Sequence, residues 1–208
     1  MKNTERTALR KTEILDIAER LFLEKGYEKT TINDILIASG MAKGSLYYHF
    51  KSKEDVLDGI IERIAEQITL KAQAIANDPA LTAHEKIFHI IASSDISGTS
   101  NEQVLEELHK SSNALLHQKS IVQTLHAIAP IMAGVVEQGI QEGIYSTQYP
   151  LESVEILLIA GQFIFDAGIF SWTPEEAQAK MLAFISITES VLGAAPGSFL
   201  FLIEGGSR

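Results

Sequence analysis

Apolar residues recur at intervals of three and four positions along almost the whole chain, and no sustained alternation of period two appears. This pattern predicts an all-α protein. The periodic segments, separated by breaks rich in Gly, Pro and Ser, predict helices over residues 8–25, 31–39, 42–49, 52–78, 82–94, 101–117, 121–143, 151–171 and 174–193.

Residues 30–53, TTINDILIASGMAKGSLYYHFKSK, have the pattern of two short helices joined by a tight turn. Thr31 and Asp34 have the spacing of a capping box, which places the start of the first helix at this point. Gly40 follows that helix and can take a positive φ without steric cost, as the turn between two steeply crossing helices commonly requires. The segment therefore predicts a helix-turn-helix.

The second helix of this motif has an apolar side and a polar side. Leu46 and Phe50, four residues apart, would point to the core. The outward positions carry donors, small residues and aromatic groups: Lys43, Gly44, Ser45, Tyr47, Tyr48 and His49. Such a composition suits a helix that enters the major groove, and Lys51 and Lys53 extend its basic edge. The motif is therefore predicted to bind DNA.

The helices on either side of the motif would complete a small head and connect it to the rest of the chain. The first helix ends at Gly26 and has one apolar face, which consists of Ile14, Ala18, Leu21 and Phe22. Ser52 and Asp55 would cap a long helix that Asp78 and Pro79 bring to an end. That long helix is expected to join the head to a larger helical body.

Two helices near the C-terminus are candidates for a dimer interface. The segment 151–171 is apolar nearly all the way round, which is typical of a helix buried on more than one side, and the next helix is amphipathic. Two copies of this pair would form a four-helix interface. The predicted interface residues are Leu151, Val154, Leu158, Gly161, Phe165, Met181, Phe184, Ile185, Thr188 and Val191. A central core helix in a monomer is the alternative.

Charge is distributed unevenly along the chain. Residues 1–53 hold ten Lys or Arg against seven Asp or Glu, a net charge of +3, whereas residues 54–208 hold seven against twenty, a net charge of −13. The basic charge therefore lies where the motif is, and the acidic remainder opposes non-specific adhesion to DNA. Cysteine is absent, which is compatible with a reducing cytosol, and a cytoplasmic protein is expected.

Three segments together resemble the TetR family of bacterial transcriptional regulators: FLEKGYEKTTINDIL, ASGMAKGSLYYHF and KSKEDVL. The resemblance implies a helix-turn-helix DNA-binding domain over residues 8–68, a ligand-binding and dimerisation domain over residues 69–195, and a C-terminal tail over residues 196–208. It implies a homodimer that binds double-stranded DNA and no cofactor. It also implies DNA contacts from Thr31, Met41, Ala42, Lys43, Gly44, Ser45, Tyr47, Tyr48, His49, Lys51 and Lys53.

The resemblance further implies repression that a small molecule relieves. A mostly apolar cavity suits a lipophilic or aromatic effector. The candidate contacts to this effector are Phe88, Ile91, Leu105, Leu108, His109, Asn113, His126, Met132, Gln162, Phe163 and Asp166. Control by a protein partner, and activation in place of repression, remain open on the sequence.

An enzyme is the least favoured function. Glu106 and His109 have a Glu-x-x-His spacing, but a di-iron bundle needs two such motifs and the sequence contains no second one. The chain carries neither a phosphate-binding Gly-rich loop nor a recognisable nucleophile elbow. The apolar residues 199–203 near the C-terminus are expected either to pack on the body or to fill a neighbouring site.

Overall fold

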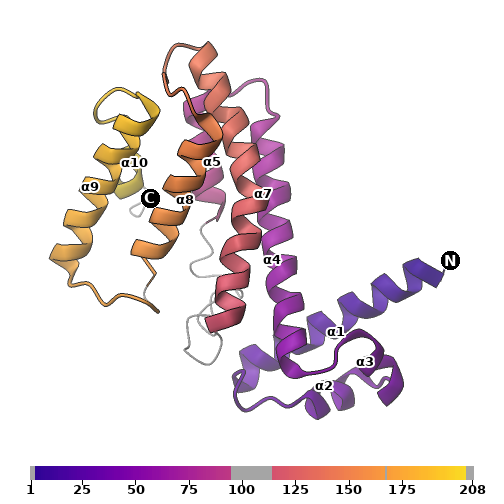
Figure 1. The fold of residues 1–208 in the computed structure, drawn as a ribbon. Coiled ribbons are helices and arrows are strands. Elements are labelled where there is room, and N and C mark those ends of the chain that lie inside the picture. Colours follow the sequence, from indigo (N-terminus) through magenta and orange to yellow (C-terminus); the bar gives the residue numbers. More distant parts are fainter. Residues whose placement is uncertain (1–2, 95–113, 167, 205–208) are drawn as a thin grey trace. The chain divides into compact units, whose positions relative to one another are not determined.

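The computed structural model describes residues 3–94, 114–166 and 168–204, and within these ranges all regular structure is helical (Figure 1). The helices are α1 (Asn3–Lys25), α2 (Ile32–Ser39), α3 (Lys43–His49), α4 (Lys53–Ala76), α5 (Ala83–Ser94), α7 (Ala114–Gln141), α8 (Pro150–Ile164), α9 (Pro174–Leu192) and α10 (Phe201–Glu204). The predicted all-α class is confirmed. Most of the helix expected over 101–117, and the break expected before it, lie outside the described residues.

The chain divides into two compact units, and the division falls inside α4. Of the described residues, 3–64 and 114–116 belong to the first unit and the others belong to the second. The predicted boundary after residue 68 lies four residues further along the same helix. Because α4 is continuous, the first unit contains its N-terminal half and the second unit its C-terminal half.

The core of the first unit is built from α1, α2, α3 and the start of α4. The predicted apolar face of α1 is buried, since Ile14, Ala18, Leu21 and Phe22 are each at most 6% exposed. A Cβ placed on Gly59 of α4 would lie 3.0 Å from the Phe50 ring and 3.1 Å from Leu15, so α4 packs closely against α1 and the end of α3. The head is therefore assembled around the first half of α4.

A charged clamp fixes α4 to α1 on the surface of this unit. The Arg63 guanidinium donates to Asp16 at 2.6 Å and to Glu19 at 2.9 Å. The Arg63 side chain is 20% exposed, and the two carboxylates lie one turn apart on α1. Arginine is suited to such a bridge because its planar fork presents several donors at once. The clamp holds the N-terminal half of α4 to the head.

The second unit has its own core, to which α4, α5, α7, α8, α9 and the segment after α9 contribute. Its central element is α7, whose buried residues include Ile128, Ala129, Val135 and Val136. Residues Leu116–Gln141 of α7 are long and apolar enough to cross a membrane by length and composition alone. α7 supplies many residues of this core, and 33% of its most apolar stretch is buried within the described structure.

Three helix bounds differ from the predicted ones by more than two residues. α1 begins at Asn3, five residues before the predicted start, and α7 begins at Ala114, so residues 114–117 belong to α7 and were assigned to the wrong helix. α8 ends at Ile164 instead of near residue 171. Asp166 accounts for that earlier end, because its side chain accepts a hydrogen bond from the Gly168 amide at 2.7 Å and turns the chain out of the helix.

The apolar segment near the C-terminus packs on the second unit, which confirms the first of its two expected roles. Phe199 is only 2% exposed and its ring lies edge-on to His84, with 5.1 Å between the ring centres. The His84 Nε2 atom donates to the Ser198 carbonyl at 2.8 Å, and His84 Nδ1 forms a hydrogen bond of 2.9 Å with the Tyr145 hydroxyl. Burial, and then the neighbouring Glu142 carboxylate, raise the pKa of Tyr145, which keeps this hydroxyl protonated.

Candidate nucleic-acid interface and ligand cavity

A reciprocal capping box begins α2, as the spacing of Thr31 and Asp34 predicted. The Asp34 amide donates to Thr31 Oγ1 at 3.1 Å, and the Asp34 carboxylate accepts from the Thr31 amide at 2.8 Å. The Asp34 carboxylate also accepts from the Thr31 hydroxyl at 2.7 Å. The two hydrogen bonds that this carboxylate accepts, first the one from the Thr31 amide and then the one from the Thr31 hydroxyl, lower the pKa of Asp34 below 3.8, and the charge of Lys25 adds a smaller effect. The box fixes where the motif begins.

The turn between α2 and α3 depends on Gly40. Its φ of +61° lies in the left-handed region that the sequence predicted for it, and its amide donates to the Ile37 carbonyl at 3.2 Å. Leu46 and Phe50 are 0% and 3% exposed, so one side of α3 is anchored in the core as expected. The other side of α3 is thereby presented to solvent.

The solvent-facing side of α3 carries side chains that were predicted to contact DNA. Tyr48 is 77% exposed and Tyr47 is 38% exposed, so Tyr47 packs partly against the head. The Lys43 ammonium lies 5.8 Å from the centre of the Tyr47 ring, and His49 lies edge-on to Tyr48. Thr31, Ala42, Lys43, Gly44 and Lys51 are also exposed, whereas Met41, Ser45, His49 and Lys53 are half-buried.

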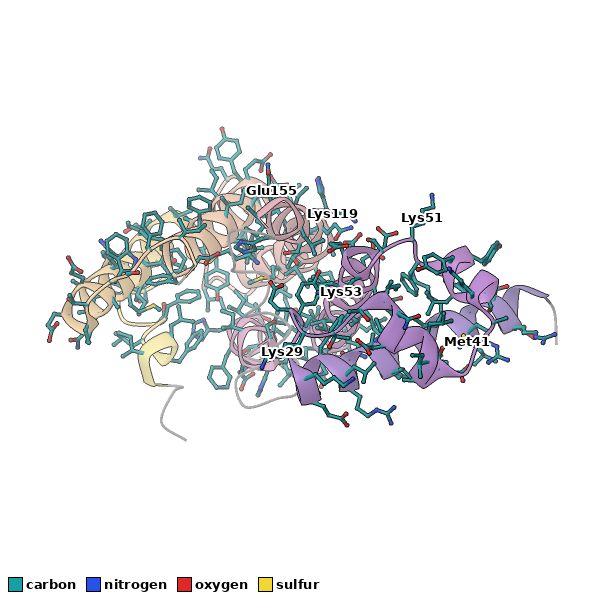
Figure 2. The ribbon with its side chains drawn as sticks, turned by 90° about the horizontal axis from the view of Figure 1, so that it is seen from below. Lys29, Met41, Lys51, Lys53, Lys119 and Glu155 are labelled. Atoms are coloured by element: carbon teal, nitrogen blue, oxygen red, sulfur yellow. The ribbon has the colours of Figure 1, made fainter. Side chains whose placement is uncertain are left out.

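The two lysines after α3 have different surroundings. Lys51 extends away from the ribbon into solvent, as Figure 2 shows. Lys53 instead donates to the Tyr27 carbonyl at 2.9 Å, and its ammonium lies 4.0 Å from the centre of the Tyr27 ring. Lys53 therefore also fastens the start of α4 to the turn that follows α1, a contact that the sequence did not indicate.

A hollow of about 620 Å³ runs along the face of the motif. One wall is formed by Ser39, Gly40, Met41, Ala42, Gly44, Ser45, Tyr48 and His49, and the other by Arg6, Thr7 and Arg10 of α1. None of these three residues was among the predicted DNA contacts: Arg6 and Thr7 precede the predicted start of the helix at residue 8, whereas Arg10 lies within it. The spacing of Arg6 and Arg10, four apart on one helical face, is the signal that could have found them.

The second unit contains an apolar cavity of about 210 Å³. Three predicted effector contacts line it: Ile91, Met132 and Gln162. Five residues predicted for the dimer interface line it as well: Val154, Leu158, Gly161, Phe184 and Thr188. The remaining wall consists of Ile87, Val136, Leu157, Leu192, Phe199 and Leu202, so the segment after α9 closes part of the cavity.

Four predicted effector contacts do not line this cavity. His126 is exposed, Phe88 is 37% exposed and packs against Phe201, and Phe163 is 49% exposed. Asp166 is buried away from the cavity lining, where its carboxylate lies 3.0 Å from His117 Nε2. The other four, Leu105, Leu108, His109 and Asn113, lie outside the described residues, as does the Glu106–His109 pair.

The apolar surface of α8 and α9 is not made of the predicted interface residues alone. Val154, Ile185 and Thr188 are at most 6% exposed within one chain, so they are core positions. Leu158, Gly161, Phe165, Met181 and Phe184 are half-buried, and Leu151 and Val191 are 39% and 37% exposed. The most exposed apolar side chains of the pair are Ile156 at 65%, Ile187 at 55%, Phe163 at 49%, Leu182 at 48% and Ile159 at 45%.

Two family models match the chain. Residues 14–60 match "Bacterial regulatory proteins, tetR family", and residues 96–187 match "Tetracyclin repressor-like, C-terminal domain". The first match covers the helix-turn-helix with the second half of α1 and the start of α4. The second includes most of the cavity wall contributed by α7, α8 and α9.

Two curated relatives match over most of their length. The fatty acid metabolism regulator protein of Bacillus subtilis is 30% identical over 86% of this chain and 90% of its own. The HTH-type transcriptional repressor KstR2 of Rhodococcus jostii is 31% identical over 69% of this chain and 71% of its own.

Solved structures share the fold. SmeT, the repressor of the Stenotrophomonas maltophilia multidrug efflux pump SmeDEF, aligns with a TM-score of 0.59 and 21% identity over 91% of this chain and 92% of its own. A TetR/AcrR family regulator from Thermobifida fusca aligns with a TM-score of 0.57 and 25% identity over 88% of this chain and 96% of its own.

Proposed function

Since the chain belongs to the TetR family of bacterial transcriptional regulators, we propose that it binds a palindromic operator as a homodimer, represses the adjacent genes, and leaves the DNA when a small lipophilic effector occupies the cavity. The protein is a DNA-binding regulator and not an enzyme. We place it in the cytoplasm, with its DNA.

The exposed face of α3 is the observation that carries the proposal. Tyr48 and Lys43 project from a helix whose opposite side is locked into the core by Leu46 and Phe50. A rigid helix with donors and aromatic groups on its free side suits the major groove. The net charge of +3 over residues 1–53 favours the phosphate backbone, while the acidic remainder limits adhesion elsewhere.

The exposed apolar side chains of α8 and α9 support a dimer. Ile156, Ile159 and Phe163 follow one another at three and four residues, and Ile187 and Val191 form a similar row on α9. Large exposed apolar residues gathered on adjacent helices mark an interaction surface. Two copies related by a two-fold axis would present two α3 helices to half-sites about 34–36 Å apart.

The cavity supports a lipophilic effector. Its wall is aliphatic and aromatic except for Gln162 and Thr188. The B. subtilis relative is named a regulator of fatty acid metabolism, which fits a lipophilic signal, and the R. jostii relative is named a transcriptional repressor, which fits repression.

The continuity of α4 supports coupling between the cavity and the DNA. Arg63 and the buried residues Val56, Leu57 and Ile60 fix its first half to the head, while its second half belongs to the unit that holds the cavity. An effector that prefers a different tilt of α4 would change the spacing of the two α3 helices. A coupling free energy of about 1–3 kcal/mol would change operator affinity roughly five- to 150-fold.

Selection of genomic DNA fragments followed by salt titration tests the proposal. We expect one palindrome to be enriched, and we expect Lys43→Ala and Tyr48→Ala to weaken binding while Lys71→Ala, at an exposed position of α4, leaves it unchanged. Enrichment of no sequence would contradict operator binding. If small lipophilic molecules that bind the cavity never change operator affinity, effector control is wrong.

A further inference from the structure

Burial changes from one part of the cavity wall to another. Five residues of the wall are each at most 3% exposed: Ile87, Val136, Val154, Leu192 and Phe199. Others reach the surface of the unit: Ile91 is 36% exposed, Gln162 is exposed, and Gly161 and Phe184 are half-buried.

The buried group and the surface group lie at opposite ends of the cavity. α5 and α8 run in one direction, and α7 and α9 run in the opposite one (Figure 1). The path from Val154 to Gln162 follows α8 forwards by eight residues, and the path from Leu192 to Phe184 follows α9 backwards by eight. Eight residues of helix rise about 12 Å. The cavity is therefore a slot of about this length, with a sealed end and an open end.

The shape and the wall of the slot restrict what fits it. A volume of about 210 Å³ spread over about 12 Å leaves a narrow space, which suits one unbranched chain better than a bulky ring system. Within the described residues no charged side chain lines the wall, so a polar group at the sealed end would lose water and gain no ionic partner. At the open end, water and the amide of Gln162 are available to such a group.

The sealed end includes a residue outside the family matches. Phe199 belongs to the segment after α9, whereas the match to the C-terminal family model ends at residue 187. The Phe199 amide donates to Glu189 Oε1 at 3.1 Å, and its ring packs edge-on against His84. The fixed position of this ring limits how deep a bound chain can enter.

We propose that the cavity binds a single-tailed amphiphile, whose unbranched alkyl tail fills the slot as far as Phe199 and whose polar head stays at the open end beside Gln162. The proposal rests on the proposed function, in which this cavity is the effector site, and it names the class of effector. The length of the tail then decides affinity, because each methylene gains apolar contact until the tail reaches Phe199.

Calorimetric titration of the full-length protein with the unbranched primary alcohols hexanol, octanol, decanol and dodecanol tests the depth of the slot. We expect binding to strengthen about fourfold for each methylene up to a limiting length and no further. Phe199→Leu should move this limit to a longer tail, and Val154→Leu, which adds volume at the same end, should move it to a shorter one. Phe88→Leu, outside the cavity wall, is the control and should leave the limit unchanged.

Decanoate and decanol, which have equal numbers of carbon atoms, test where the head lies. Gln162→Lys should strengthen the binding of decanoate up to about fivefold, the range of an exposed ion pair, and leave the binding of decanol unchanged. Gln178→Lys, at an exposed position of α9 outside the cavity wall, should affect neither probe.

Four results would overturn the proposal: binding of no probe, binding that strengthens through dodecanol without a limit, a limit that neither Phe199→Leu nor Val154→Leu moves, or equal responses of decanoate to the two lysine substitutions. Operator affinity is measured separately in the presence of decanol. A limit that moves with the sealed end, without any effect of decanol on operator affinity, would sustain the slot and contradict the proposed effector control.

Discussion

Lys86 donates a hydrogen bond of 2.8 Å to the main-chain carbonyl of Ala76, the last residue of α4. The same ammonium donates to Gln138 of α7 at 2.7 Å, and Gln138 in turn donates to the Leu81 carbonyl at 3.2 Å. Lys86 is only 4% exposed, which is rare for lysine. The C-terminal end of α4 is therefore tied to α5 and α7, two helices that line the cavity.

We expect Lys86→Met to destabilise the protein by about 1–3 kcal/mol, because it leaves the Ala76 carbonyl and the Gln138 amide oxygen without their donor. It should also reduce the effect of a bound effector on operator affinity, since the end of α4 would no longer follow the cavity wall. Urea denaturation and operator titration measure the two effects. Lys71→Met, at an exposed position of α4, is the control and should change neither quantity.

Arg6 and Arg10 are predicted to bind DNA phosphates from the wall of the hollow opposite α3. Replacement of either by Ala should weaken operator binding to a similar degree for all sequences and reduce the salt slope by about one. Lys11, a neighbour on α1 that lies outside the hollow, provides the control. An equal loss with Lys11→Ala would mean that net charge alone accounts for the effect.

Gly40 and Gly44 should respond to Ala in opposite directions. Neither site has an atom within 4 Å of an added Cβ, so a steric clash with neighbouring atoms affects neither substitution. Gly40 has a φ of +61°, where a side chain costs about 1–2 kcal/mol, whereas Gly44 lies within α3, where Ala gains up to about 1 kcal/mol. Urea denaturation should show this difference. Gly44→Ala should nevertheless weaken operator binding, because its methyl group lies on the DNA-facing side.

The capping box should make the head sensitive to acid. The pKa of Asp34 is below 3.8 in the folded protein, so its contribution to stability is complete above that value and is lost as the pH falls through the lowered pKa. We expect Asp34→Asn to be less stable than the wild-type protein at neutral pH, with a difference that shrinks in acid. Thermal unfolding across pH measures this difference, and a constant difference would contradict the assignment.

A charge on the exposed face of α8 or α9 should separate the protomers. Ile156→Asp and Ile187→Asp each place a carboxylate where we expect apolar contact with a second copy. Sedimentation should show a shift to monomer and operator affinity should fall, because a single motif contacts too little DNA. Leu70→Asp, at a position of α4 that is 64% exposed, is the matched control. Unchanged association in the first two variants would place the interface elsewhere.

The sequence alone determined the helix-turn-helix, because its signals act over short distances along the chain. The box of Thr31 and Asp34 fixes where α2 begins, Gly40 permits the turn, and the four-residue spacing of Leu46 and Phe50 decides which side of α3 is buried. Each depends on neighbours within one or two helical turns, so each could be predicted without knowledge of the fold.

Only the tertiary structure decided which residues of α8, α9 and the segment after them line the cavity and which stay exposed. A helix that is apolar all round has no unique inner face, so its periodicity could not tell that Val154 and Leu158 line a cavity while Ile156 and Ile159 face solvent. Which face of the helix is buried depends on which distant segments of the chain pack against it. Phe199 closes the cavity from far along the chain, and no local spacing records such a contact.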